Sequence, residues 1–148
     1  PITNGHIDLI HRACKLFDEV IIAITQNVNK TSLLSIDQRI EAVEASITSI
    51  SNTQVLGFNS LLVDFARKHN AQIIIRGLRA VSDFEYEFQL SGMNKRLNPG
   101  IETLFMTPSE EFANISSSLV REILSLGGDI SAFVPASVET ILHRISTK

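Results

Sequence analysis

Two arginines, Arg76 and Arg79, are separated by Gly77 and Leu78 and follow a short apolar segment over 72–75. That segment has the composition of a buried strand. In a parallel α/β sheet the carboxyl ends of the strands open onto the ligand crevice. Guanidinium groups at that edge can bind phosphate oxygens through paired, charge-assisted hydrogen bonds. The segment therefore predicts recognition of a polyphosphate or a phosphate ester.

The acidic segment after the arginines leaves a simpler interpretation open. Three carboxylates follow within a few residues: Asp83, Glu85 and Glu87. Exposed arginines often pair with such carboxylates on a protein surface. Under this interpretation Arg76 and Arg79 form ion pairs with Asp83 or Glu85. The helix that we expect over 82–97 would then present a solvated face or a subunit contact.

A second candidate site is the tetrapeptide Thr3-Asn4-Gly5-His6, which leads into a segment with helical periodicity over 5–17. The first N–H groups of a helix have no partner within the helix and attract anions. Gly5 would let a phosphate approach the backbone, and Thr3 would steady the loop. His6 could then donate a hydrogen bond to a phosphate oxygen. A capped helix start with an exposed histidine is the alternative.

A third candidate is the run of three serines, Ser116-Ser117-Ser118, at the start of a helix that we expect over 116–126. Their hydroxyls and the free N–H groups of the helix start can together bind an anion. One serine is enough for an N-cap, so the run exceeds what capping requires. Lys30, alone in a polar loop after an apolar strand, is a further candidate, with a solvated lysine as its alternative.

Other chemistries lack their residue patterns in this chain. The sequence has no Cys-x-x-Cys, no His-Glu-x-x-His and no other metal-site spacing, so we expect no metal held by protein ligands alone. It also lacks the glycine-rich fingerprints of dinucleotide-binding Rossmann folds and of Walker loops. Phosphate would therefore be held by helix N-termini and by basic side chains.

Composition and charge narrow the class of protein. The 148-residue chain has a formal net charge of −3, which disfavours a broad nucleic-acid-binding surface, because such domains are usually basic. Its single cysteine, Cys14, cannot form an internal disulfide, which favours a reducing compartment such as the cytoplasm. No apolar run approaches the ~20 residues of a membrane span. No signal peptide is visible.

Apolar periodicity predicts that helices and strands alternate along the chain. Short runs rich in β-branched residues predict strands over 20–24, 53–58, 72–75 and 102–106. Apolar residues at helical spacing predict helices over 5–17, 60–69, 82–97, 116–126 and 136–146. A further helix should begin at Ser35, where Gln38 can complete a capping box.

This alternation is typical of βα units around a parallel sheet. We therefore expect a single domain over residues 1–148 with an α/β fold, in which the parallel sheet is doubly wound and Rossmann-like. The chain begins at Pro1 in a segment that reads as a loop, whereas a βα protein normally begins with a strand. We expect that the natural polypeptide extends further at its amino end and that a first strand precedes Pro1.

Taken together, these segments closely resemble the phosphopantetheine adenylyltransferase family of the nucleotidyltransferase superfamily. Thr3-Asn4-Gly5-His6 matches the superfamily's (H/T)xGH motif. Ile115-Ser116-Ser117-Ser118 with Arg121 matches its ISSSxx(R/K) signature. The block from Arg76 to Glu87 is similar to the segment that marks this family within the superfamily. The likeness runs along essentially the whole chain and implies a fold of the nucleotidyltransferase type.

The resemblance implies a reversible reaction in which ATP and 4′-phosphopantetheine give dephospho-coenzyme A and pyrophosphate, a step of coenzyme A biosynthesis. It implies Mg²⁺ as cofactor, bound mainly through the ATP phosphates. His6 and Lys30 would be catalytic, with His6 on the ATP phosphates, and Lys30, Leu62 and Arg76 would bind 4′-phosphopantetheine. The remaining ATP contacts would come from Gly77, Leu78, Arg79, Glu87, Phe112, Ala113, Asn114, Ile115, Ser116, Ser117 and Ser118.

The same resemblance implies a cytoplasmic homo-oligomer, commonly a hexamer, that has neither nucleic acid nor a membrane as partner. The sequence departs from the family at its amino end. Family members have a first strand and a Gly-Thr-Phe-Asp segment just before the position of Pro1. The threonine and phenylalanine of that segment help to bind both substrates.

Three other functions stay open on the residues alone. The same groups fit adenylyl or cytidylyl transfer to another phosphate acceptor. A regulatory module would bind ATP or coenzyme A without releasing pyrophosphate, although the joint presence of His6, Lys30 and the serine run argues against it. A phosphoacceptor receiver domain would need aspartates clustered at strand ends, and none of the predicted strands ends in one.

Overall fold

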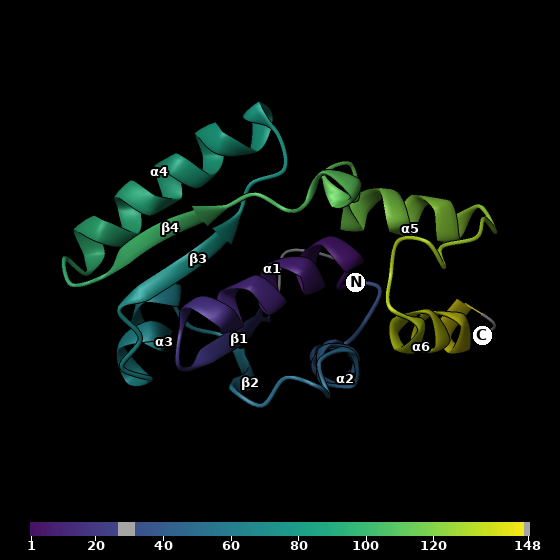
Figure 1. The fold of residues 1–148 in the computed structure, drawn as a ribbon, viewed down its shortest axis with the longest axis horizontal. Coiled ribbons are helices and arrows are strands. Elements are labelled where there is room, and N and C mark those ends of the chain that lie inside the picture. Colours follow the sequence, from purple (N-terminus) through teal and green to yellow (C-terminus); the bar gives the residue numbers. More distant parts are fainter. Residues whose placement is uncertain (27–31, 147–148) are drawn as a thin grey trace. The chain divides into compact units, whose positions relative to one another are not determined.

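A computed structural model describes residues 1–26 and 32–146 of the chain (Figure 1). Helices and strands alternate through the first two thirds of it, as the periodicity predicts. The helices are α1 (Asn4–Leu16), α2 (Ile36–Ser46), α3 (Leu62–Lys68), α4 (Val81–Leu97), the 3₁₀ turn η1 (Glu110–Phe112), α5 (Ser117–Ser125) and α6 (Ala136–Ser146). The strands are β1 (Val20–Thr25), β2 (Thr53–Phe58), β3 (Ile73–Gly77) and β4 (Glu102–Met106).

The chain is organised as two compact units. Unit 1 comprises Pro1–Phe58 and Asn114–Lys148, and unit 2 is the intervening segment Asn59–Ala113. A single domain over residues 1–148 stays a prediction. In the described part of the chain, no helix is both long and apolar enough to cross a bilayer.

The four strands form two parallel pairs, one in each unit. In unit 1, β1 pairs with β2 from Val20 opposite Thr53 to Thr25 opposite Phe58. In unit 2, β3 pairs with β4, from Ile73 opposite Glu102 onwards. The predicted parallel α/β class is confirmed, whereas the described strands form two two-stranded sheets and not one continuous sheet. A strand before Pro1 stays a prediction.

Helices α1 and α2 pack against the β1–β2 pair in unit 1. Val43 of α2 and its C-cap residue Ile47 are buried against Ile24 of β1. The predicted capping box at the start of α2 is confirmed: the Ser35 hydroxyl accepts from the Gln38 N–H at 3.2 Å, and the Gln38 side chain accepts from the Ser35 N–H at 2.9 Å. These contacts fix where the helix begins after the β1 loop.

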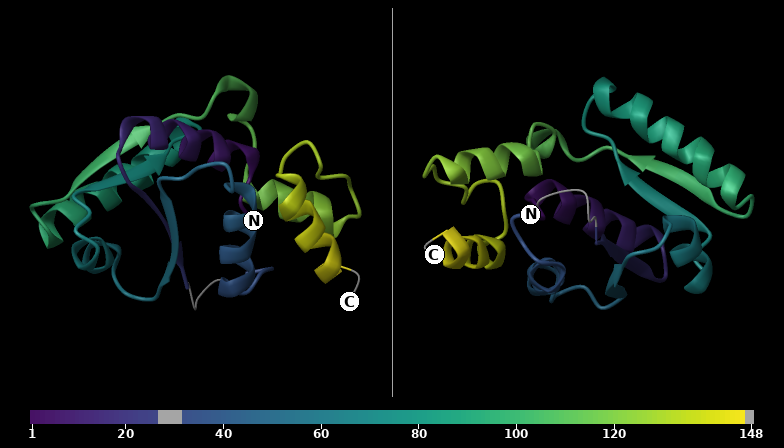
Figure 2. Two further views of the ribbon diagram at one scale, coloured as in Figure 1. Left: turned by 60° about the horizontal axis from the view of Figure 1, so that its bottom comes forward. Right: turned by 180° about the vertical axis from the view of Figure 1, so that it is seen from behind.

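Helices α5 and α6 are the last two helices of unit 1 (Figure 2). Together with Ala42 of α2 they form a second apolar cluster. The buried residues of this cluster are Leu34, Ala42, Val120, Leu124, Ile130, Val134, Val138, Ile141 and Leu142. Helix α5 ends at a glycine in the left-handed region, Gly127 with φ of 74°. The Gly127 N–H donates to Leu124 O at 3.0 Å and the Gly128 N–H to Ile123 O at 2.9 Å. This is a Schellman motif, which ends the helix and turns the chain towards α6.

In unit 2, α3 and α4 lie along the β3–β4 pair (Figure 1). Val63 and Ala66 of α3 bury Ile74 of β3 together with Ile101. Helix α4 contacts β4 through Phe84. The ring of Phe84 packs edge-on against that of Phe105, and the ring centroids are 6.1 Å apart. These contacts place the first turns of α4 over the end of the strand pair.

Some element boundaries differ from the sequence prediction. Strand β3 continues through Arg76 and Gly77, because their backbones pair with Phe105 and Met106. Arg76 is therefore part of the strand and does not follow it. The helix predicted over 60–69 is shorter, since Leu61 has an extended backbone and caps it.

The apolar cluster of α5 and α6 predicts a large stability difference between two leucine substitutions. Leu142 is fully buried in that cluster, whereas Leu126 is 81% exposed. We expect Leu142→Ala to lower the free energy of unfolding by about 2–5 kcal/mol, because it removes buried methyl groups and leaves a cavity. Leu126→Ala should change it by less than about 0.5 kcal/mol. Chemical denaturation of both variants measures the difference, and equal midpoints would contradict this packing.

Candidate active site

His6 is held at the start of α1 by the residue that caps the helix. The Thr3 backbone N–H donates to His6 Nδ1 at 3.1 Å, and the Thr3 hydroxyl lies 2.7 Å from the same nitrogen. A backbone N–H can only donate, so Nδ1 is the acceptor. The proton of the neutral ring is therefore on Nε2. The His6 side chain is exposed and Thr3 is buried, and Nε2–H is the donor group of the neutral ring.

The backbone at the start of α1 is partly used within the protein. The Asn4 N–H donates to Phe133 O at 2.9 Å, and its side-chain amide donates to Ala132 O at 3.2 Å. The loop between α5 and α6 thus occupies one of the N–H groups that the sequence suggested for an anion. Gly5 is buried, so the chain is closely packed where the helix begins.

Each of the three serines at the start of α5 has a different partner. Ser116 is the N-cap, and its hydroxyl accepts from the Leu119 N–H at 3.1 Å. The Ser117 hydroxyl donates to Pro1 O at 2.7 Å. Ser118 accepts from Arg121 Nη2 at 3.1 Å. One serine caps the helix, as expected, and the other two connect the helix start to neighbouring groups.

The Ser117–Pro1 hydrogen bond brings two of the predicted motifs together. Pro1 directly precedes the segment that contains Thr3 and His6, and Ser117 is the first residue of α5. The N-termini of α1 and α5 therefore lie side by side in unit 1. Both ends carry partial positive charge, so the arrangement favours an anion that spans them.

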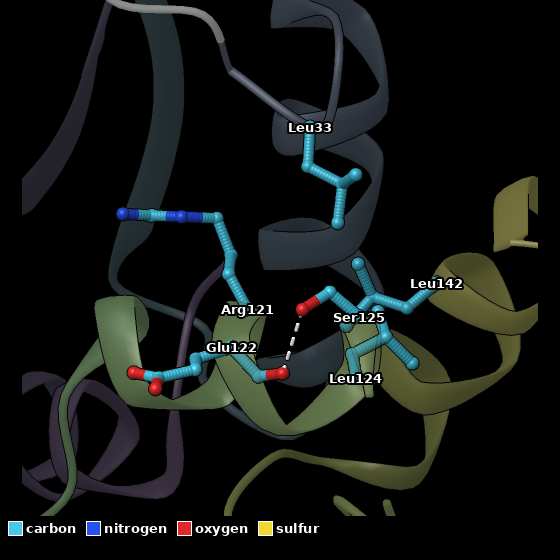
Figure 3. A pocket seen from close by; sticks show the side chains of 6 residues that line it. All are labelled: Leu33, Arg121, Glu122, Leu124, Ser125 and Leu142. Carbon is cyan, nitrogen blue, oxygen red and sulfur yellow. Dashed lines mark hydrogen bonds between the residues drawn. The ribbon is translucent and has the colours of Figure 1, made fainter. Parts of the chain in front are cut away.

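A pocket of about 480 Å³ lies beside α5 (Figure 3). Half of the residues that line it are leucines, and the full set is Leu33, Arg121, Glu122, Leu124, Ser125 and Leu142. The Ser125 hydroxyl donates to the Glu122 carbonyl at 2.8 Å, so it is used within the helix. None of these residues was expected to contact a substrate.

In unit 2, Arg76 forms a two-point ion pair with Glu87. Arg76 Nε donates to Glu87 Oε2 at 2.6 Å, and Nη2 donates to Oε1 at 2.7 Å. The pair raises the pKa of Arg76, because the carboxylate accepts hydrogen bonds from the charged guanidinium. The ion-pair alternative is thus realised for Arg76, with Glu87 in place of the expected Asp83 or Glu85.

Arg79 lies in the loop between β3 and α4, and it pairs with a different carboxylate. Its Nε lies 3.2 Å from Asp83 Oδ2, which is one of the ion pairs that the sequence left open. Both side chains are partly exposed, and such pairs contribute little to stability. Gly77 ends β3, and the Leu78 N–H donates to Met106 O at 2.9 Å, so the pairing continues one residue beyond the strand.

The remaining predicted residues are distributed over both units. Leu62 begins α3 and packs against the cluster around Ile74. Phe112 is in η1, and Ala113 follows it at the end of unit 2. Asn114 and Ile115 lead into α5 in unit 1. Lys30 lies outside the described residues.

Across residues 1–26 and 32–146, no group of three or more His, Cys, Asp or Glu side chains could hold a metal ion.

Two interactions were missed by the sequence reasoning. Glu87 was expected to contact ATP, and its pairing with Arg76 was not foreseen, because a strand residue and a helix residue 11 positions apart share no local spacing rule. The contact between Ser118 and Arg121 could have been found, since residues three apart face each other on a helix.

Comparison with known proteins identifies the family to which this chain belongs. The cytidylyltransferase-like family matches residues 1–123. A phosphopantetheine adenylyltransferase of Vesicomyosocius okutanii is 65% identical over 146 residues, which cover 98% of this chain and 92% of the relative. The chain belongs to the phosphopantetheine adenylyltransferase family.

Two further phosphopantetheine adenylyltransferases are similar over nearly the same span. That of Methylococcus capsulatus is 53% identical over 144 residues, which are 97% of this chain and 89% of the relative. That of Legionella pneumophila strain Lens is 56% identical over 144 residues, which are 97% of this chain and 85% of the relative. This phosphopantetheine adenylyltransferase family member is thus a nucleotidyltransferase, and the resemblance seen in its motifs is confirmed.

The Thr3–His6 contact predicts the protonation pattern of the imidazole. Because the Thr3 N–H donates to Nδ1, the neutral ring should carry its proton on Nε2. Long-range ¹H–¹⁵N NMR spectra at a pH where the ring is neutral distinguish the two ring nitrogens. We expect Nε2 to show the shift of a protonated nitrogen and Nδ1 that of an unprotonated one. A spectrum with the assignments reversed would rule out the observed capping contact in solution.

Proposed function

We propose that this chain transfers the adenylyl group of ATP to 4′-phosphopantetheine, which gives dephospho-coenzyme A and pyrophosphate. The observation that carries the proposal is the 65% identity, over 98% of this chain, to a relative named for this reaction. Two adjoining helix N-termini, His6 and the serine run support the proposal, since such groups are suited to phosphate oxygens.

The chemistry requires positioning and charge stabilisation more than covalent help. A phosphate oxygen of the acceptor attacks the α-phosphorus of ATP in line, and the bond to the leaving pyrophosphate breaks. The acceptor phosphate is already an anion near neutral pH, so no general base is needed. Donors fixed before the reaction stabilise the charge that spreads over the phosphorus oxygens.

Unit 1 supplies donors that suit the ATP phosphates. His6 presents Nε2–H from a ring whose other nitrogen is held by Thr3. The start of α5 adds the partial positive charge of a helix N-terminus next to that of α1. Because these groups are held by the fold, little reorganisation is needed when charge develops in the transition state.

Unit 2 supplies two of the groups proposed for the acceptor. Arg76 would bind the phosphate of 4′-phosphopantetheine, and Leu62 would lie along the pantetheine chain. Lys30, which is outside the described residues, is proposed as a second cation. Gly77, Leu78 and Arg79, with Glu87, would contact ATP. The partial exposure of Arg76 supports this assignment, since its side chain is 40% accessible while paired with Glu87.

Further parts of the proposal concern the cofactor, assembly and location. Mg²⁺, held mainly by ATP phosphates, would neutralise charge on the departing pyrophosphate. The protein would work as a homo-oligomer, with a hexamer as the expected form, in the cytoplasm. Measuring pyrophosphate release from ATP with 4′-phosphopantetheine and with other phosphate acceptors tests the reaction. Release with another acceptor alone, or with none, would overturn it.

His6→Ala should reduce turnover strongly. We expect kcat to fall by more than about 100-fold, the loss typical of removing one fixed donor to a transition-state oxyanion. His11→Ala is a matched control, because His11 is an exposed histidine on the same helix. Steady-state pyrophosphate release measures both variants. An unchanged kcat in His6→Ala would remove this imidazole from the mechanism.

Arg76→Ala should weaken acceptor binding and leave ATP binding nearly unchanged. The KM for 4′-phosphopantetheine should rise about 10- to 100-fold, as expected for one or two charge-assisted hydrogen bonds. Arg67→Ala serves as the control, because Arg67 is an exposed arginine in the same unit. Calorimetric titration with each substrate separates the two affinities. If only ATP affinity fell, the roles proposed for Arg76 and Arg79 would have to be exchanged.

A further inference from the structure

We propose that Glu87 acts as a positioning residue that holds the Arg76 guanidinium ready for the acceptor phosphate. This inference rests on the proposed function, because it assigns the acceptor phosphate to Arg76. The positioning role is additional to the contact with ATP that the family resemblance implies for Glu87. All residues involved belong to unit 2.

The geometry of the pair leaves one edge of the guanidinium available. Glu87 accepts from Nε and from Nη2 of Arg76, which are the two donors on one side of the planar group. A guanidinium has five N–H donors in a fixed fork. The pair uses two of them, so both N–H groups of Nη1 and the second one of Nη2 stay available. One of Nη1 and the second of Nη2 point in parallel, and such a pair matches two phosphate oxygens.

The exposed fractions of the two side chains indicate that the guanidinium faces a ligand and that the carboxylate holds it in place. The side chain of Glu87 is only 12% exposed, whereas that of Arg76 is 40% exposed. A ligand from solvent would therefore reach the arginine more easily than the carboxylate behind it.

Neighbouring packing fixes the carboxylate in turn. Phe84, one turn before Glu87 on α4, stacks on Phe88 at 5.6 Å and meets Phe105 at 6.1 Å. Phe105 is the strand partner of Arg76 in the β3–β4 register. The Phe84–Phe105 contact thus connects α4 to β4 beside Arg76, whereas the Phe84–Phe88 stack lies within α4.

A held arginine binds phosphate better than a mobile one, because a long, flexible side chain otherwise loses rotamer freedom when the ligand arrives. The carboxylate has an opposing effect, since its negative charge reduces the attraction of the site for an anion. The two effects predict opposite outcomes for a neutral substitution. If Glu87 mainly repels the phosphate, Glu87→Gln strengthens acceptor binding. If it mainly positions Arg76, the same substitution weakens it.

The experiment measures KM for both substrates and kcat in Glu87→Gln. We expect the KM for 4′-phosphopantetheine to rise about 3- to 30-fold, the range of coupling between directly interacting side chains. Any change in the KM for ATP should persist in the Arg76→Ala background, because it does not act through the arginine. Glu85→Gln is the matched control, because Glu85 is an exposed glutamate on the same helix. It should change neither constant.

A double-mutant cycle tests whether Glu87 acts through the arginine. In the Arg76→Ala background, Glu87→Gln should cause no further rise in the KM for 4′-phosphopantetheine, since the group that it positions is absent. Equal effects in both backgrounds would overturn the proposal. If Glu87→Gln fails to fold, Glu87→Asp gives the same test, because it keeps the charge but shortens the side chain by one methylene.

Other outcomes separate this inference from the proposed function. A rise in the KM for ATP alone would overturn the positioning role in favour of direct ATP contact. A fall or no change in the KM for 4′-phosphopantetheine would overturn it as well, with the reaction itself unaffected. If the unmodified protein released no pyrophosphate from these substrates, that result would overturn the proposed function and would not test the role of Glu87. Calorimetric titration with 4′-phosphopantetheine alone would then still show whether Glu87→Gln weakens its binding.

Discussion

Parallel strand pairing is the constraint on which the rest of the structure depends. Parallel strands have their carboxyl ends at the same edge, and the helix that follows each strand must begin near that edge. In unit 1 the β1–β2 pair is covered by α1 and α2. In unit 2 the β3–β4 pair ends at Gly77 and Met106, and the loop from Leu78 leads directly into α4. Arg76, Gly77 and Leu78 lie at this edge because the strand pairing places them there.

Helix and strand boundaries can be predicted from the sequence wherever a short run of residues is enough to define them. Strands β2 and β4 have the bounds that β-branched and apolar runs predict, because nothing outside the segment is needed to define them. The start of α2 is equally local, since Ser35 and Gln38 satisfy each other three residues apart. The end of β3 could not be placed, because Arg76 is a strand residue only through its pairing with Phe105, which is far along the chain.

The candidate site was predicted by residue type but not by contact. The motif around His6 and the serine run were visible as helix starts, yet nothing in the spacing shows that Ser117 reaches Pro1 across the sequence. The arginines were visible too, and the partner of Arg79 was among the alternatives. Glu87 was not recognised as the partner of Arg76, because that contact depends on how α4 packs on β4 through Phe84 and Phe105. Long-range contacts of this kind are set by tertiary packing, which one sequence does not reveal.

The two ring nitrogens of His6 have separate roles. Nδ1 stabilises the first turn of α1, because it accepts the N–H of Thr3, while Nε2 is the donor proposed for the ATP phosphates. Replacement by alanine removes both roles at once, so that variant combines a weakened helix start with the loss of the proposed donor. A methyl group placed on one ring nitrogen by synthetic incorporation would separate the two roles. Under the proposed mechanism, methylation of Nε2 would lower activity and leave the helix start intact, whereas methylation of Nδ1 would disturb the helix start first.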